Sequence, residues 1–201
     1  MEIILATGNE GKVREFREMF SKLPVHLTSL KDHWDPVPAI DEYGLCFYEN
    51  AKIKADWVFE RTQGVWALAD DSGLEVDALN GAPGVKSARF AGEKAMSKEN
   101  NQKLLSLLEG IPDEKRTARF RCVLVLKIAQ DQYLSAESTC EGQIAHEGTG
   151  EMGFGYDPVF IPEGSSVSLA NYNSEKKHMI SHRGKALKIL KKVLYGYFGE
   201  E

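Results

Sequence analysis

The chain has 201 residues, of which 42% are hydrophobic and 27% charged, and its formal net charge is −5. This length suffices for one domain with a proper core, and we expect a single α/β domain over residues 1–201. An acidic chain offers no extended basic surface to a phosphate backbone, so we expect no nucleic-acid partner. No apolar run approaches the roughly 20 residues of a membrane span, and the N-terminus does not resemble a secretory signal. We therefore expect no membrane partner.

The three cysteines, Cys46, Cys122 and Cys140, lie far apart in the sequence and show no metal-ligand spacing. This usage is typical of reduced thiols, and it favours a cytoplasmic protein. A phosphate-bearing ligand of such an acidic protein needs a local basic cluster, a metal ion, or both.

The first part of the chain alternates apolar runs with helical patterns. Residues 2–6 form a short apolar run that is typical of a buried strand. Residues 13–23 carry apolar side chains at helical spacing. Residues 31–44 are rich in Pro, Asp and Gly and predict a loop. Residues 48–62 predict a second helix with an apolar face formed by Ala51, Ala55, Val58 and Phe59.

The middle of the chain predicts mainly strands. Residues 65–79, VWALADDSGLEVDAL, indicate a strand that ends at two aspartates, then a Ser-Gly turn, then a second strand. The glycines and proline of residues 80–84 predict a turn, and residues 98–110 predict a helix that ends at a glycine. Residues 116–129 and 133–145 predict a β-hairpin.

The last part of the chain is irregular before it becomes helical. Residues 147–166 are rich in Gly and Pro, and a helix is expected from about His182. Interleaved helices and strands predict an α/β fold, and the hairpin predicts a mixed rather than a purely parallel sheet.

The first chemical motif, TGNEGK at residues 7–12, lies where the first strand leads into a helix. Backbone N–H groups and the helix dipole attract an anion at such a point. Lys12 in the first turn is mildly unfavourable for the helix itself, and a bound phosphate would reverse that effect. The alternative is a solvated surface lysine, and the motif is not a P-loop.

A second helix start, in ISHRGKAL, carries His182 and Arg183. Two cationic helix starts in one acidic protein indicate that both face the same anion. Lys177, five residues earlier, is a candidate third cation of this cluster.

The adjacent aspartates of ADDSG, Asp70 and Asp71, supply two hard oxygen ligands where an α/β protein commonly binds its ligand. Mg²⁺ characteristically binds one or two carboxylates together with water and substrate phosphates. The alternative is an Asx turn or a helix cap. Glu42, in the preceding loop, is a candidate third carboxylate.

The GFGYDP segment combines glycines, which let the backbone approach a flat ligand, with aromatic faces at Phe154 and Tyr156. An ordinary aromatic turn is the alternative. Taken together, two cationic helix starts, a carboxylate pair and an aromatic loop describe a site for a nucleotide with its phosphates, magnesium and base.

The motifs occur in the order that is typical of the inosine triphosphate pyrophosphatase family. TGNEGK, ADDSGLEVDAL with GAPGVKSARF, GTGEMGFGYDPVF and ISHRGKAL carry the resemblance, which extends from Met1 to about Leu194. It implies an elongated mixed sheet flanked by helices, two lobes with an active-site cleft between them, and a homodimer. It also implies Mg²⁺-dependent hydrolysis of ITP, dITP or XTP to the monophosphate and pyrophosphate.

The resemblance further implies roles for individual residues. Asp71 corresponds to the proton acceptor and to a metal ligand, with Asp70 and Glu42 as further metal ligands. The residues expected near the phosphates are Thr7, Gly8, Asn9, Glu10, Gly11, Lys12, Lys54 and Arg89. The other residues expected to contact the nucleotide are Ser72, Phe154, Gly155, Tyr156, Asp157, Lys177, His182 and Arg183.

Two other functions are compatible with the same motifs. One is a Mg²⁺-dependent phosphomonoesterase that uses Asp70 and Asp71, has no base selectivity and releases orthophosphate. The other is a nucleotide-binding module that senses its ligand and does not cleave it.

Overall fold

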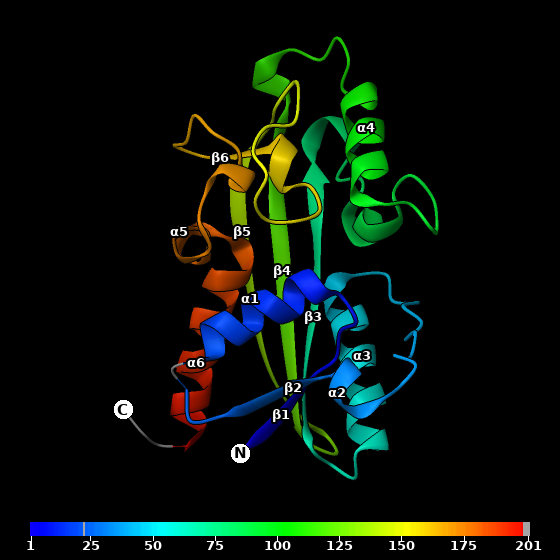
Figure 1. Ribbon diagram of the computed structural model, residues 1–201, viewed down its shortest axis with the longest axis vertical. Coiled ribbons are helices and arrows are strands. Elements are labelled where there is room, and N and C mark those ends of the chain that lie inside the picture. The colour runs from blue at the N-terminus through cyan, green and yellow to red at the C-terminus, as the bar shows by residue number, and fades with distance from the viewer. Residues whose placement is uncertain (22, 199–201) are drawn as a thin grey trace. The chain divides into compact units, whose positions relative to one another are not determined.

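The computed structural model describes residues 1–21 and 23–198, in which strands and helices alternate along the chain (Figure 1). The described strands form a sheet in the order β2-β1-β3-β4-β5-β6. They are β1 (Glu2–Leu5), β2 (His26–Ser29), β3 (Trp66–Val76), β4 (Thr117–Ala129), β5 (Gln132–Ile144) and β6 (Phe160–Pro162). β1 pairs in parallel with β2 and β3, whereas β5 pairs antiparallel with β6. The predicted mixed sheet is confirmed.

The described α-helices are α1 (Glu10–Phe20), α2 (Leu30–His33), α3 (Phe47–Arg61), α4 (Ser97–Leu107), α5 (Ser174–Ile180) and α6 (His182–Phe198). Among them, α1, α3, α4 and α6 correspond to helices predicted from the sequence, whereas α2 and α5 were not predicted. Short 3-10 turns are η1 (Asp77–Leu79), η2 (Gly84–Arg89), η3 (Asp113–Lys115), η4 (Asp157–Val159) and η5 (Leu169–Asn171). None of the helices within the described part of the chain is long and apolar enough to cross a membrane.

The chain divides into two compact units. The first contains residues 1–71 and 122–137 and the described residues from Gly184 onward, and the second contains residues 72–121 and 138–183. The long strands β3, β4 and β5 each contribute residues to both units. A single domain over residues 1–201 stays a prediction.

In the first unit, α1 and α6 lie on one side of the sheet and α3 lies on the other (Figure 1). Phe16 of α1 and Leu187 of α6 pack with Leu68 and Leu124 of the strands in one apolar cluster. The apolar face predicted for the helix over residues 48–62 is confirmed, because its members are buried in α3. These residues are Ala51, Ala55, Val58 and Phe59.

The second unit has its own apolar cluster. Leu74 of β3, Leu104 of α4, Phe120 of β4 and Phe160 of β6 belong to it, together with Tyr156 from the loop before η4. Leu104 of α4 and Tyr156 belong to the same core, so this core anchors the end of the glycine-rich segment that follows β5.

Two local predictions are wrong. Residues 65–79 do not form strand, turn and strand, because β3 continues unbroken from Trp66 to Val76 through the Ser-Gly pair. The expected loop over residues 31–44 begins with the helical turn α2, because the backbone N and Oγ of Ser29 both donate to Oδ2 of Asp32 at 2.7 Å. This interaction between Ser29 and Asp32 caps the N-terminus of α2, a helix that the composition of the segment did not predict.

Candidate active site

The two aspartates of β3 are buried inside a strand rather than exposed at its end. Asp70 is 0% and Asp71 is 5% exposed. A buried carboxylate is costly unless it is paired, so both need cationic partners. The structure supplies one lysine to each, from two different helices of the first unit.

Lys12 of α1 is the partner of Asp70. Its Nζ forms an ion pair with Oδ1 of Asp70 and lies 3.3 Å from the Asp70 carbonyl oxygen. The predicted position of Lys12 in the first turn of a helix is confirmed, and Asn9 caps that helix by accepting from the Lys12 backbone N at 3.1 Å. The interpretation of Lys12 as a solvated surface lysine is wrong, because its side chain is directed onto a buried carboxylate.

Lys54 of α3 is the partner of Asp71. Its Nζ donates to Oδ1 of Asp71 at 2.9 Å, to the carbonyl oxygen of Asp70 at 3.0 Å and to Oε1 of Glu42 at 2.9 Å. The structure thus places Glu42 in the same cluster as the aspartates, although its loop gave only a weak sequence signal. We call Lys12, Glu42, Lys54, Asp70 and Asp71 the carboxylate–lysine cluster.

Burial and charge act in opposite directions on this cluster. Burial raises the pKa of Asp71 above its ordinary value, although Lys54 and Lys12 act to lower it. Burial by itself would lower the pKa of Lys54, but the carboxylates of Asp71 and Glu42 outweigh it and raise that pKa. Lys54 therefore stays charged, and Asp71 is more basic than an ordinary aspartate.

One oxygen of the cluster is unsatisfied. Oδ2 of Asp71 is buried and has no hydrogen-bond partner among the described residues. A buried acceptor of this kind is costly, and a cation or a water molecule would satisfy it. No group of three or more His, Cys, Asp or Glu side chains in the described ranges is arranged to hold a metal ion. The unsatisfied Oδ2 of Asp71 is thus available to a cation that takes its remaining ligands from elsewhere.

Cys122 is a member of this site that the sequence did not indicate. Its Sγ donates to Oδ2 of Asp70 at 3.3 Å, on the side of the carboxylate opposite Lys12. Both residues are completely buried. A thiol in the middle of an apolar strand resembles an ordinary core residue, and only the pairing of strands brings it to the aspartate.

The second unit contains a separate group of site residues around Asp157. Oδ2 of Asp157 accepts from the backbone N of Phe154 at 2.8 Å and from Nζ of Lys177 at 2.6 Å. Gly153 has φ +78°, and a Cβ there would collide with the Asp157 carboxylate. The glycine is therefore required for the tight turn that closes this loop onto Asp157.

Phe154 is flanked by cations. Nζ of Lys177 lies 4.8 Å and Cζ of Arg183 lies 5.6 Å from the centre of its ring. Arg183 also donates to Oγ of Ser72 at 3.2 Å, which is the residue directly after Asp71 on β3. The structure thus brings Phe154, Lys177, Arg183 and Ser72 together in the second unit, and their contact with a nucleotide stays a prediction.

His182 and Tyr156 are held by aromatic and core contacts. The ring of His182 stacks on Phe120, with centroids 4.7 Å apart and planes at 11°. Tyr156 packs in the core of the second unit, and its hydroxyl donates to the carbonyl oxygen of Ser87 at 2.8 Å. Burial raises the pKa of this hydroxyl. The stacking face expected at Tyr156 is therefore buried, which leaves the ring of Phe154 as the aromatic surface.

The remaining predicted phosphate residues are less constrained. Gly8, Asn9 and Glu10 are exposed, and the side chain of Asn9 is used as a helix cap. Nε of Arg89, at the end of η2 in the second unit, lies 3.8 Å from Glu93. A role for these residues in phosphate binding stays a prediction.

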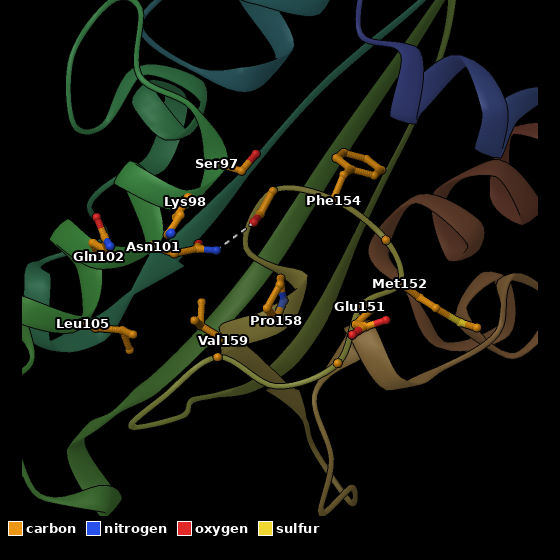
Figure 2. A pocket seen from close by; sticks show the side chains of 14 residues that line it. Ser97, Lys98, Asn101, Gln102, Leu105, Glu151, Met152, Phe154, Pro158 and Val159 are labelled. Atoms are coloured by element: carbon orange, nitrogen blue, oxygen red, sulfur yellow. Dashed lines mark hydrogen bonds between the residues drawn. The ribbon is translucent and has the colours of Figure 1, made fainter.

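A pocket of about 470 Å³ lies in the second unit beside the Phe154 loop (Figure 2). Its walls come from α4, through Ser97, Asn101 and Leu105, and from the glycine-rich chain between Gly148 and Val159. Nδ2 of Asn101 donates across it to the carbonyl oxygen of Gly155 at 3.1 Å. This contact is not predictable from the sequence, because Asn101 lies in an ordinary amphipathic helix.

The fold and the site define a class: an α/β protein with a mixed sheet that carries a buried carboxylate–lysine cluster on a central strand and an aromatic–cationic loop further along the chain. The chain belongs to the Ham1 family, whose model matches residues 3–193.

Several related proteins are similar to this one over nearly the whole chain. The dITP/XTP pyrophosphatase of Desulforamulus reducens is 49% identical over 194 residues, which cover 96% of each chain. That of Vibrio parahaemolyticus is 48% identical over 94% of each chain. The solved structure of a HAM1 protein from Coxiella burnetii is 41% identical, with a TM-score of 0.86 over 98% of this chain and 99% of its own.

Proposed function

We propose that this protein is a Mg²⁺-dependent nucleoside triphosphate pyrophosphohydrolase. Its substrates are the deaminated purine nucleotides ITP, dITP and XTP, and its products are the monophosphate and pyrophosphate. The observation that carries the proposal is the unsatisfied Oδ2 of Asp71, buried beside two lysines in a chain of net negative charge. Relatives that are 48–49% identical are dITP/XTP pyrophosphatases, which supports this choice of substrate.

The carboxylate–lysine cluster is proposed to act on the triphosphate. Asp71 and Asp70 would hold Mg²⁺, with Glu42 next to them through Lys54. When bound there, the ion would neutralise charge on the triphosphate and on the leaving pyrophosphate. Asp71, whose pKa burial raises, is proposed to orient the attacking water and accept its proton. Lys12 and Lys54 stabilise the negative charge that spreads onto the phosphate oxygens in the transition state.

The residues around Phe154 are proposed to bind the purine. The ring of Phe154 offers a stacking surface. Lys177 and Arg183 lie close to this ring, and His182 directly precedes Arg183 in the chain. Hypoxanthine and xanthine present an oxygen acceptor where adenine presents an amino donor. Donors such as Arg183 and His182 satisfy the acceptor, and adenine would leave a buried group unpaired, which is costly.

We also propose that the protein acts as a homodimer in the cytoplasm. The homodimer follows from the family resemblance. The location is supported by the cysteines, because no disulfide joins any of them within the described residues.

The test is a panel of ITP, dITP, XTP, ATP and GTP, assayed with and without Mg²⁺ for release of pyrophosphate and of orthophosphate. We expect pyrophosphate as the product, dependence on Mg²⁺, and a higher kcat/KM for the deaminated nucleotides. Comparable kcat/KM values for ATP and ITP would contradict the proposed selectivity. Release of orthophosphate would indicate a phosphomonoesterase instead, and binding of ITP without turnover would indicate a sensing module.

A further inference from the structure

The turn from Phe154 to Asp157 is closed by a hydrogen bond from the backbone N of Asp157 to the carbonyl oxygen of Phe154 at 3.2 Å, and the carbonyl group of Gly155 lies outside that bond. Gly155, between Phe154 and Tyr156, has φ +63°, and a Cβ built on it would meet no atom within 4 Å. Neither a side chain nor a close neighbour therefore restricts this residue. Because the Gly155 carbonyl group takes no part in the hydrogen bond that closes the turn, a further contact has to hold its direction.

That contact comes from α4. Nδ2 of Asn101 donates to the carbonyl oxygen of Gly155 at 3.1 Å, across 54 positions of sequence. Figure 2 shows Asn101 on the α4 side of the loop and Phe154 on the other side, with this hydrogen bond drawn as a dashed line. The amide thus contacts the loop on the α4 side, and the half-buried side chain of Phe154 lies on the other side.

The helix that carries Asn101 is itself firmly held. The side chain of Asn100 accepts from the backbone N of Ala91 at 2.7 Å and donates to the carbonyl oxygen of Ala88 at 3.1 Å. Nζ of Lys103 donates to the carbonyl oxygen of Phe90 at 2.6 Å. The next turn of α4 contributes Leu104 to the core. Asn101 therefore connects the loop to a rigid element.

The side-chain amide of Asn101 is only partly satisfied by hydrogen bonds among the described residues, which is unfavourable for the stability of the fold. Its Oδ1 is buried and accepts no hydrogen bond from the described residues. An unsatisfied buried amide oxygen opposes folding, and an aliphatic side chain of similar size would avoid it. An asparagine at this position is unfavourable through its unsatisfied Oδ1, but its Nδ2 makes the hydrogen bond to Gly155 that an aliphatic side chain could not make.

We propose that Asn101 is a positioning residue for purine recognition, which sets the orientation of Phe154 by holding the Gly155 carbonyl group. This inference rests on the proposed function, because it assigns the Phe154 loop to the base of the nucleotide. Asn101 acts through the loop and lies outside the carboxylate–lysine cluster. Its loss therefore affects KM and base selectivity far more than kcat.

The test compares Asn101→Asp with Gln102→Glu. Asn101→Asp keeps the shape of the side chain, but it removes the donor and places an acceptor against the Gly155 carbonyl. Gln102→Glu makes the same change of charge at the next position of α4, where the side chain is exposed. Asn101→Ser, which is neutral and too short to reach Gly155, replaces Asn101→Asp if thermal unfolding shows that the latter is not folded.

Two readouts are measured on the full chain. The first is hydrogen–deuterium exchange of the peptide that covers residues 152–158, which we expect to be faster in Asn101→Asp and unchanged in Gln102→Glu. The second is the steady-state kinetics for ITP and GTP. For Asn101→Asp we expect KM for ITP to rise roughly tenfold, the equivalent of one hydrogen bond, with kcat nearly unchanged and a smaller preference for ITP over GTP.

The outcomes separate this inference from the proposed function. If wild-type protein prefers ITP and Asn101→Asp matches it in exchange and in KM, the positioning role is overturned and the proposed function stands. A fall in kcat at constant KM also overturns the positioning role. If wild-type protein does not cleave ITP, the proposed function fails, and unchanged exchange in Asn101→Asp would then independently overturn the anchoring of Gly155.

Discussion

Replacement of Lys54 by methionine tests whether the carboxylate–lysine cluster is as tightly coupled as its geometry indicates. Methionine keeps an unbranched chain of similar length and removes the charge. The variant leaves Oδ1 of Asp71 without its donor at 2.9 Å, next to an Oδ2 that is already unsatisfied. The same substitution removes the contacts of Lys54 to Glu42 and to the Asp70 carbonyl oxygen.

The expected loss is large because both partners are buried. The side chains of Lys54 and Asp71 are each 7% exposed. Removing one partner of a buried pair costs about 3–5 kcal/mol, because an uncompensated charge stays in the interior. The matched control is Lys52→Met on the same helix, whose ion pair with Asp56 is 2.7 Å long but involves a lysine side chain that is 40% exposed. There we expect a loss of at most about 1 kcal/mol.

The assay is urea denaturation, from which the free energy of unfolding is obtained for wild type, Lys54→Met, Asp71→Asn and the double variant. Asp71→Asn removes the charge that Lys54→Met leaves unpaired, so the double variant should be less destabilised than the sum of the two single changes. Additive losses, or a Lys54→Met variant as stable as Lys52→Met, would refute the reasoning.

The penalty in Lys54→Met also depends on pH. Burial already raises the pKa of Asp71 in the folded state, and loss of Lys54 removes an interaction that lowers it. A carboxyl group whose folded pKa lies above its unfolded value adds stability below the unfolded value, and that contribution is lost as pH rises through the folded value. The difference in stability between Lys54→Met and wild type should therefore be largest at neutral pH and shrink on acidification.

Two further substitutions test the proposed catalytic step and the stability of the fold separately. Asp71→Asn should lower kcat for ITP by roughly 10²- to 10⁴-fold, because it removes the proposed proton acceptor. Circular dichroism should show a folded chain, and near-normal kcat in this variant would exclude Asp71 as the acceptor. Arg116→Met should lower the free energy of unfolding by about 3 kcal/mol, because the carbonyl groups of Leu108, Ile144 and Ala145 each lose the hydrogen bond that the Arg116 guanidinium donates. A urea midpoint equal to that of wild type would contradict the capping role of Arg116.

Local patterns in the sequence were enough to predict most elements. The helical spacing after residue 12 and the apolar face of residues 48–62 correspond to α1 and α3. The hairpin predicted near residues 116–145 corresponds to β4 and β5, consecutive strands that are neighbours in the sheet. These elements are predictable because hydrophobic periodicity depends only on nearby residues.

The turn predicted within residues 65–79 was wrong because residues distant in the chain compensate the local preference of this segment. Two aspartates followed by Ser and Gly favour a turn, yet β3 continues through Asp70 and Asp71. Lys12 and Lys54, which lie 58 and 17 positions earlier in the chain, neutralise the two carboxylates inside the strand. The residues next to the aspartates in the sequence do not show that these two lysines will be their partners.

The sequence by itself therefore determined the family of the protein, the order of its elements and the residue types of its site. Tertiary structure decided which charges meet: Lys12 with Asp70, and Lys54 with Asp71 and Glu42. It also decided that Asn101 holds the loop of Phe154. The physical reason is that composition and periodicity are properties of neighbouring residues, whereas the charge state and orientation of a site depend on burial and on partners that only folding brings together.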